Sequence, residues 1–180
     1  MHGIIDYARA AISFGEARYL YVKHLLPEPV LHYMQAYCDI LRANDKFRKD
    51  DQHSLAIGGD LAFDALLCWI RPSVSRLVGF DLAPTYSYAC IYTERGALSR
   101  YGHRAGHEIS VAIPIEIPKH ADPLVLHLEA PNMPEAKIEM SEGDGCIYDE
   151  RGVEHWSGPI RQHGYIQLFL HFIDQRALAS

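Results

Sequence analysis

Histidine is the residue type that points most directly to chemistry in this chain. The 180 residues include 11 histidines, and the spacing of His103, His107 and His155 is suggestive. If residues 101–107 are extended, the side chains of Tyr101, His103 and His107 share one face, because alternate residues of a strand point the same way. Neutral imidazoles bind iron, zinc, copper and nickel. The spacing therefore predicts a metal site to which His155, 52 residues after His103, supplies a further ligand.

Other polar side chains in the same region have competing interpretations. Tyr101 would either contact a metal or a bound substrate, or pack with its hydroxyl satisfied. In an extended chain Glu108 would point to the opposite face from His103 and His107, so we interpret it as structural. His163 and His171 are interpreted as structural or surface residues.

Several other kinds of site are excluded by missing motifs. The sequence has no Gly-rich phosphate loop, no G-x-S-x-G and no H-E-x-x-H. No C-x-x-C pair is present among its four cysteines, so we expect buried free thiols at each of them. The cysteines are Cys38, Cys68, Cys90 and Cys146.

Composition narrows the class of protein further. Apolar residues make up 48% and charged residues 22% of the chain, a globular balance that argues against disorder. A net charge of −6 argues against nucleic acid as a partner, because phosphate binding needs a basic surface. There is no run of eighteen apolar residues and no signal-peptide pattern, so we expect a cytoplasmic protein without a membrane partner.

The elements that must position these residues change in character along the chain. Apolar residues recur with a helical period over 30–41 and 61–70, where Pro72 predicts a stop, and 72–78 would form a short helix ended by Gly79. The polar stretch 42–52 reads as a solvated loop. From Pro84 onward the period becomes two, with short segments separated by turn residues. The predicted strands cover 86–92, 107–115, 124–128, 136–140, 145–148 and 165–174.

This order of elements predicts an α+β fold in one domain, residues 1–180. Residues 1–80 would supply mainly helical support, and residues 82–174 would form a β barrel closed by antiparallel pairing. Tyr86, Tyr88 and Tyr92 would line one face of that barrel, either as packed core or as the wall of a substrate pocket. An exposed helix face on so small a domain would also suit a homodimer.

Five ordered segments of the barrel half carry a family resemblance. They are Pro84–Tyr88 followed by Ile91-Tyr92, Leu98 with Glu108-Ile109-Ser110, Gly143-Asp144-Gly145, His155-Trp156, and Gln167 with Phe169-Leu170-His171. Together they resemble the iron- and 2-oxoglutarate-dependent oxygenases related to prolyl hydroxylases. The resemblance implies a double-stranded β-helix, a jelly-roll or cupin-like barrel. It also implies an Fe(II) site of two histidines and one carboxylate, with positions left for oxoglutarate and O₂.

The metal motif departs from the family pattern in its first half. His155 matches the distal histidine. Aligning Leu98 and Glu108 without a gap puts Tyr101 at the usual first histidine and His103 at the usual aspartate, and Arg104 then matches a basic residue of the family. The alternative register makes His103 the first histidine and leaves Ala105 in place of the carboxylate, as in the related halogenases. Neither register supplies a family-type carboxylate.

The cosubstrate positions also depart from the pattern. In the family, an arginine or lysine about ten residues after the distal histidine pairs with the far carboxylate of oxoglutarate. Tyr165 stands at that position here, and Arg161 comes earlier, in an expected turn. Cys90 occupies a strand position where arginine is common. Arg104, Arg161, Tyr86 and Tyr165 are therefore the candidates for catalytic or cosubstrate contacts.

Three functions follow from this reading. The first is a non-haem, Fe(II)-dependent oxygenase that acts on a small organic substrate, with 2-oxoglutarate as electron source if an arginine reaches it. The second is a cupin-type enzyme in which His103, His107 and His155 hold a metal without oxoglutarate. The third is a barrel that has lost its iron site and binds a ligand or a partner protein.

Overall fold

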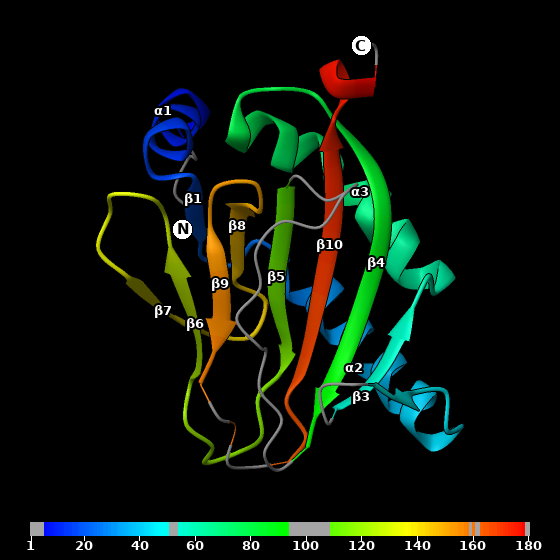
Figure 1. Ribbon diagram of the computed structural model, residues 1–180. Coiled ribbons are helices and arrows are strands. Elements are labelled where there is room, and N and C mark those ends of the chain that lie inside the picture. The colour runs from blue at the N-terminus through cyan, green and yellow to red at the C-terminus, as the bar shows by residue number, and fades with distance from the viewer. Residues whose placement is uncertain (1–5, 51–53, 94–108, 159, 161–162, 179–180) are drawn as a thin grey trace.

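The computed structural model describes residues 6–50, 54–93, 109–158, 160 and 163–178. Within these ranges the chain forms helices first and strands afterwards, with three short strands interleaved among the helices (Figure 1). The α-helices are α1 (Tyr7–Ala17), α2 (Glu28–Ala43) and α3 (Leu61–Val78), and a 3-10 helix, η1 (Gln175–Leu178), follows the last strand. The strands are β1 (Tyr19–Val22), β2 (Arg48–Lys49), β3 (Ser54–Gly58), β4 (Leu82–Tyr92), β5 (Ile109–Glu116), β6 (Leu124–Glu129), β7 (Ala136–Met140), β8 (Gly145–Asp149), β9 (Glu154–Ser157) and β10 (Ile166–Asp174).

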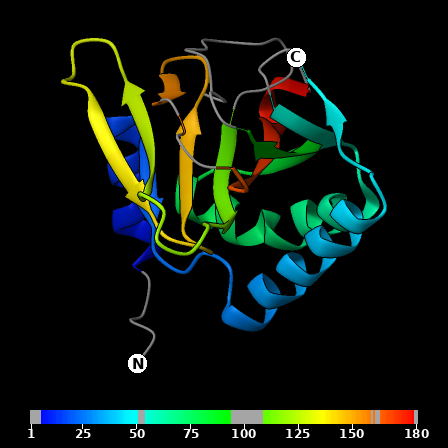
Figure 2. The ribbon, with the colours of Figure 1, turned by 90° about the horizontal axis from the view of Figure 1, so that it is seen from below.

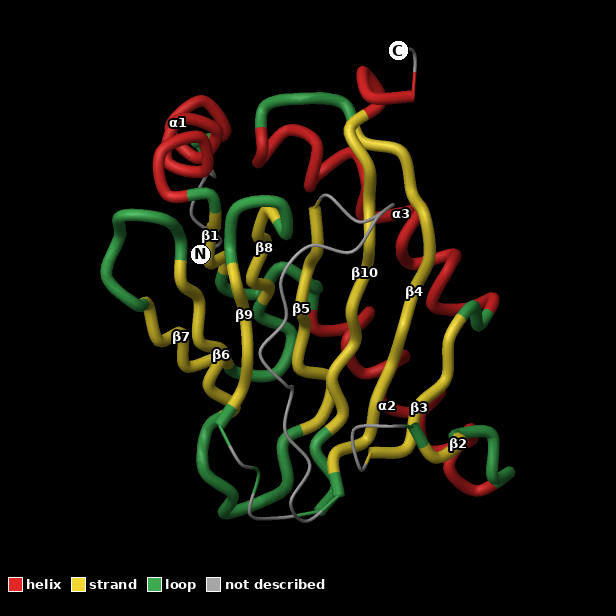
Figure 3. Tube along the Cα trace, in the orientation of Figure 1, coloured by secondary structure: helices red, strands yellow, loops and turns green. Residues whose placement is uncertain are grey.

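Two antiparallel sheets form the barrel. The larger sheet has the strand order β1-β8-β5-β10-β4-β3-β2, and the smaller has the order β7-β6-β9. β10, the last strand in the chain, lies between β4 and β5, and the tube trace shows these three long strands side by side (Figure 3). The two sheets face each other, and their facing apolar side chains form one of two core clusters.

The helices cover the outer face of the larger sheet (Figure 2). Every second residue of β4, β5 and β10 points toward them and packs with apolar residues of α1, α2 and α3. This second cluster includes Phe63, Ile70, Ile113 and Leu168, all at most 2% exposed. The sheet is therefore buried on both faces, which explains why its central strands read as nearly continuous apolar runs.

The helix over 61–78 shows one local prediction to be wrong. We expected a stop before Pro72, but α3 runs through Pro72 to Val78. A proline inside a helix leaves the carbonyl four residues earlier without its bond, here that of Cys68. Cys68 is exposed, so water can bind that carbonyl, and the prediction that all four cysteines are buried is wrong at this residue. The helix ends as expected at Gly79, whose φ of +87° is left-handed.

The N-terminal half contains more strand than its sequence indicated. β1 pairs with β8, and β3 pairs with β4, so both extend the larger sheet. β2 is a two-residue exposed strand within the stretch that we interpreted as a loop. All three strands are short, and β1 and β3 pair with residues that lie far away along the chain, whereas β2 pairs with the neighbouring β3.

The predicted fold class is confirmed. The structure is α+β, with helices packed against a double-stranded β-helix of antiparallel strands. The predicted strands at 86–92, 124–128, 136–140, 145–148 and 165–174 all fall within observed strands or one residue outside them. No helix among the described residues is long and apolar enough to cross a membrane.

Candidate functional site in the barrel interior

Strand alternation determines which side chains face the barrel interior. The pairing of β10 with β4 places Gln167 beside Cys90, Phe169 beside Tyr88, and His171 beside Tyr86. On β5 and β8 the pair Ser110 and Tyr148 has the same orientation. The predicted shared face of Tyr86, Tyr88 and Tyr92 is thus observed, and it is the inner face.

His155 lies on β9, in the smaller sheet, and faces the same interior. It pairs with Leu128 of β6 and is 6% exposed, whereas its neighbour Trp156 is on the outer face, stacked on His127. The ring of Tyr148 packs against the His155 ring with a centroid distance of 4.6 Å. A turn from β8 leads into β9, which brings His155 to the end of the barrel where β8 finishes and β5 begins.

Three buried polar side chains form a hydrogen-bonded cluster at this end. Ser110 Oγ donates to Glu150 Oε1 at 2.5 Å and lies 2.7 Å from His171 Nδ1. The Nδ1 atom of His171 is 3.7 Å from the same carboxylate oxygen. The Tyr86 ring stacks on the His171 ring at 4.4 Å. Since a buried carboxylate is costly unless hydrogen-bonded, the Ser110 hydroxyl helps to retain Glu150 in the interior.

The opposite end of the interior is also polar but contains no ion pair among the described residues. Tyr92 Oη donates to Gln167 Oε1 at 2.7 Å, and Tyr165 Oη donates to the carbonyl of Asp122 at 2.6 Å. Burial raises the pKa of Cys90 to about 12, so this thiol stays protonated at neutral pH. Burial, and secondarily the charge of Glu150, raises the pKa of Tyr148.

Most of the predicted site residues lie outside the described residues. Tyr101, His103, Arg104 and His107 belong to the stretch 94–108, and Arg161 lies at 161–162. Of the predicted set, the structure brings Tyr86 and His155 to the same end of the interior and puts Tyr165 at the opposite end.

The described residues alone do not make up the iron site that the family resemblance implies. No group of three histidine, cysteine, aspartate or glutamate side chains within the described ranges is arranged to hold a metal ion. His155 is the described residue that fits such a role by position. An iron site here would need ligands from outside the described residues, and the predicted ligands His103 and His107 lie there.

The described residues fit 2-oxoglutarate less well than they fit a metal ion. None of the buried residues in the described ranges is a lysine or an arginine, so no described cation can pair with a carboxylate in the interior. The hydroxyl of Tyr165, at the position expected for that cation, is already donated to Asp122.

Sequence reasoning missed Ser110, Glu150 and Gln167 as interior polar groups. Gln167 and Ser110 lay in segments that carried the resemblance, but no role was assigned to them. Glu150 follows a predicted strand and precedes a glycine turn, where a glutamate usually faces solvent. The sequence contains one indication of this position. Tyr148 and Glu150 are two residues apart, so their side chains lie on the same side of an extended chain.

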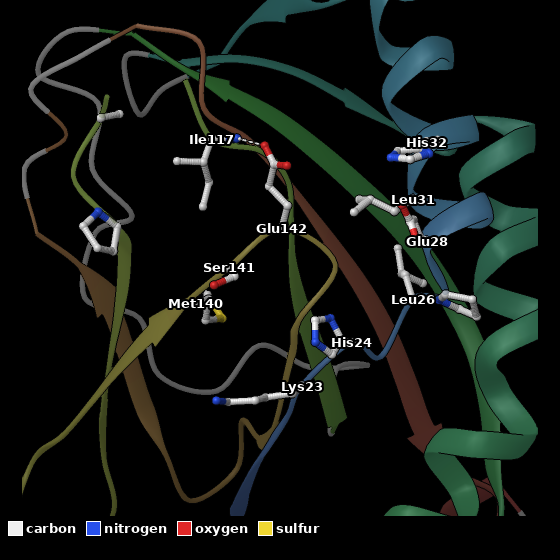
Figure 4. A pocket seen from close by; sticks show the side chains of 13 residues that line it. Lys23, His24, Leu26, Glu28, Leu31, His32, Ile117, Met140, Ser141 and Glu142 are labelled. Atoms are coloured by element: carbon white, nitrogen blue, oxygen red, sulfur yellow. Dashed lines mark hydrogen bonds between the residues drawn. The ribbon is translucent and has the colours of Figure 1, made fainter. Parts of the chain in front are cut away.

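A separate groove lies at the other end of the barrel strands (Figure 4). It has a volume of about 1070 Å³ and lies between the β1–α2 connection and the turns after β5 and β7. Lys23, His24, Glu28 and His32 line it, and Glu142 accepts a 2.7 Å hydrogen bond from the Ile117 amide. Its charges are mixed, and its lining includes neither His155 nor His171 of the barrel interior.

Comparison with known proteins gives similarity in structure only. No protein-family model and no curated protein sequence matches the chain. Among solved structures, a Pseudomonas putida prolyl-4-hydroxylase has a TM-score of 0.71 at 12% identity, over 92% of this chain and 97% of that one. A Trichoplax adhaerens prolyl hydroxylase, in complex with a hypoxia-inducible-factor peptide, has a TM-score of 0.71 at 15% identity, over 97% and 92%.

A third structure extends the similarity beyond the prolyl hydroxylases. It is SnoK, a non-haem, alpha-ketoglutarate-dependent carbocyclase from nogalamycin biosynthesis, with a TM-score of 0.75 at 10% identity, over 96% of this chain and 85% of that one. The family resemblance read from the sequence is therefore confirmed for the fold. The chain has the double-stranded β-helix of the iron- and 2-oxoglutarate-dependent oxygenases.

Proposed function

We propose that the protein is a non-haem, metal-dependent oxygenase that acts on a small organic substrate. The observation that carries the proposal is the position of His155, a buried histidine on β9 that faces the interior of an oxygenase-type barrel. The Tyr148 ring packs against it, and Ser110, Glu150 and His171 form a hydrogen-bonded cluster at the same end of the interior. A bound iron ion would supply the chemistry of O₂ activation.

The chain's own residues have separate roles in this proposal. His103 and His155 would hold the metal, and His107 would complete the ligand set or leave a position open. Tyr101 and Arg104 would contact the reacting groups. Arg161, Tyr86 and Tyr165 are the proposed cosubstrate contacts, although Tyr165 must first give up its bond to the Asp122 carbonyl.

The two alternative functions receive less support. Three solved structures with the same fold are described as a 2OG-Fe(II) oxygenase and as two non-haem, alpha-ketoglutarate-dependent enzymes, and none of the three is described as a three-histidine enzyme or as a binding protein. The three-histidine alternative is distinguished by O₂ consumption that needs His107 and does not respond to added oxoglutarate. A barrel that binds no metal would consume no O₂, with or without added oxoglutarate.

The deciding experiment compares Fe(II) binding by the wild-type protein and by a His155 variant. Protein purified anaerobically is titrated with Fe(II), and O₂ consumption and succinate release are followed with oxoglutarate. We expect wild type to bind one Fe(II) and His155→Ala to bind it at least tenfold more weakly. His127→Ala, on the outer face of the same sheet, is the matched control and keeps wild-type affinity. Equal iron affinity in wild type and His155→Ala would overturn the proposal.

A further inference from the structure

The outer face of α3 is apolar, although it points away from the sheet that the helix covers (Figure 2). Leu61 is 85% exposed and Trp69 is 54% exposed, and Ala65, Cys68 and Pro72 are exposed as well. None of the exposed residues of α3 between 61 and 72 is charged. We call these five residues the α3 stripe. A helix that is apolar on all sides is normally covered on all sides, so the stripe indicates a missing partner surface.

The spacing of the stripe is that of a helix-pairing seam. Leu61, Ala65, Cys68 and Pro72 are four, three and four residues apart, which keeps them in one row along the helix. The two middle residues are small, so a second helix can approach closely at the centre of the row. The partner surface that fits such a row is another helix.

The charges beside the stripe identify which helix. Asp64 and Arg71 are seven residues apart, so they flank the stripe on the same side, and both are partly exposed. Asp64 accepts a hydrogen bond from Ser87 Oγ at 2.6 Å through Oδ1, and its Oδ2 atom can accept from a second donor. When two copies of α3 pack antiparallel, residues on the same flank face each other. Asp64 of each copy then faces Arg71 of the other.

The opposite orientation lacks this complementarity. In a parallel pair of helices, each flanking residue lies near the residue five positions further along the partner helix. Arg71 would then lie near Arg76 of the second copy, and like charges would meet. The order of charges along α3 therefore matches a second, antiparallel α3, whereas an unrelated partner protein would require no such match within this helix.

We infer that the α3 stripe is the interface of a homodimer, in which two copies of α3 pack antiparallel about a two-fold axis. The axis passes between Ala65 and Cys68, so that Leu61 of each copy packs against Pro72 of the other. The Cys68 carbonyl that Pro72 leaves without its helical bond retains a water there, as polar groups in interfaces commonly do. The interface uses no residue of the barrel interior, so the inference is independent of the proposed oxygenase activity.

The first test measures the mass of the full-length protein in solution. Sedimentation equilibrium over a range of concentrations should show a reversible dimer with twice the mass of one chain. Ala65→Glu puts two carboxylates beside the axis and should weaken the dimer at least about tenfold, while glutamate at this exposed position suits the helix. Met133→Glu is the matched control. Met133 is 40% exposed in the turn between β6 and β7 of the smaller sheet, so this variant should associate within twofold of wild type.

The second test reverses the flanking charges. Arg71→Glu should weaken the dimer about fivefold, because each Asp64 would then face a carboxylate in place of a cation. The double variant Asp64→Arg with Arg71→Glu exchanges the two charges and should return the dissociation constant to within about twofold of wild type. Circular dichroism and thermal denaturation report whether each variant is folded.

The third test locates the interface through Cys68. The other three cysteines, Cys38, Cys90 and Cys146, are buried, so a thiol reagent such as DTNB modifies Cys68 in the folded protein. The rate of this modification should fall as the concentration of wild-type protein rises through its dimer dissociation constant. In Ala65→Glu the rate should not change with protein concentration.

Three results would overturn the inference. A wild-type protein that stays monomeric at high micromolar concentration would mean that a different partner covers the stripe. A dimer that resists Ala65→Glu and leaves Cys68 equally reactive would lie on another surface. A double charge exchange that remains as weak as Arg71→Glu alone, in a folded protein, would contradict the antiparallel arrangement.

Discussion

Two tyrosines of the barrel interior are similarly buried but differ in the hydrogen bonding of their hydroxyls. Tyr92 and Tyr148 are 2% and 0% exposed, but only the Tyr92 hydroxyl has a hydrogen-bond acceptor among the described residues, at Gln167. The same chemical change, from tyrosine to phenylalanine, should therefore have opposite effects on stability at the two positions.

Tyr148→Phe should leave the free energy of unfolding of the ligand-free protein unchanged or raise it by up to about 1 kcal/mol, because it removes a buried hydroxyl with no partner. Tyr92→Phe should lower it by about 1–3 kcal/mol, because it leaves Gln167 Oε1 buried and unsatisfied. Urea denaturation of both variants measures the difference. A loss of more than 1 kcal/mol in Tyr148→Phe would contradict the assignment of its hydroxyl as unpaired.

Residue types and spacing predicted only part of the candidate site. His155 and the inward face of Tyr86, Tyr88 and Tyr92 could be read from the sequence, because strand alternation depends on local order alone. The cluster of Ser110, Glu150 and His171 could not be read in this way. Its members come from separate strands and a turn, and only the pairing of β5 with β8 and β10 brings them together.

At the scale of elements, Gly79 lies where α1 packs closely against the end of α3. It ends α3 in a left-handed conformation, and a Cβ atom built there would lie 2.9 Å from the Ala11 Cβ atom of α1. Gly15, by contrast, lies inside α1 with no heavy atom within 4 Å of the site of its missing Cβ. The two glycines therefore make a matched pair for substitution by alanine.

Gly79→Ala should lower the free energy of unfolding by at least about 1–2 kcal/mol, the cost of a left-handed alanine, with the contact to Ala11 adding to it. Gly15→Ala should raise stability by about 0.5–1 kcal/mol, the usual difference between the two residues inside a helix. Thermal denaturation of the two variants is the measurement. A stabilising Gly79→Ala would contradict the left-handed conformation of this residue as well as its close contact with Ala11.

A second contact between elements gives a prediction about pH. Tyr37 of α2 donates to both carboxylate oxygens of Asp60, at 2.9 and 2.8 Å, and Asp60 also caps the N-terminus of α3. Burial, together with this hydrogen bond and the charge of Asp60, raises the pKa of Tyr37 to about 12. A raised pKa means that the contribution to stability is complete below about pH 10, the unfolded value, and is lost between pH 10 and 12.

Wild-type protein should therefore lose stability more steeply between pH 10 and 12 than Tyr37→Phe does. Tyr33→Phe, at an exposed position of the same helix, should retain the wild-type dependence. Urea midpoints at intervals across this range measure both slopes. Identical slopes for wild type and Tyr37→Phe would mean that the Tyr37–Asp60 contact does not contribute to folding.

At the scale of the whole molecule, the helices and strands could be predicted from the sequence better than the pairing of the strands. Helices first and a barrel afterwards is the observed order, because the change from a helical period to a period of two is a local signal. The division into a helical half and a barrel half was less accurate. β1 and β3 leave the first half and join the larger sheet beside β8 and β4, and nothing near them in sequence specifies those partners.

The position of β10 has a consequence for how the molecule forms. This strand comes last among the described strands, yet it occupies the middle of the larger sheet, with β4 on one side and β5 on the other. During synthesis those two strands leave the ribosome well before the segment that joins them. They must wait with unpaired edges, and exposed edges of this kind favour association with other chains. Completion of the barrel is thus a late step over long sequence separations, and such topologies fold slowly.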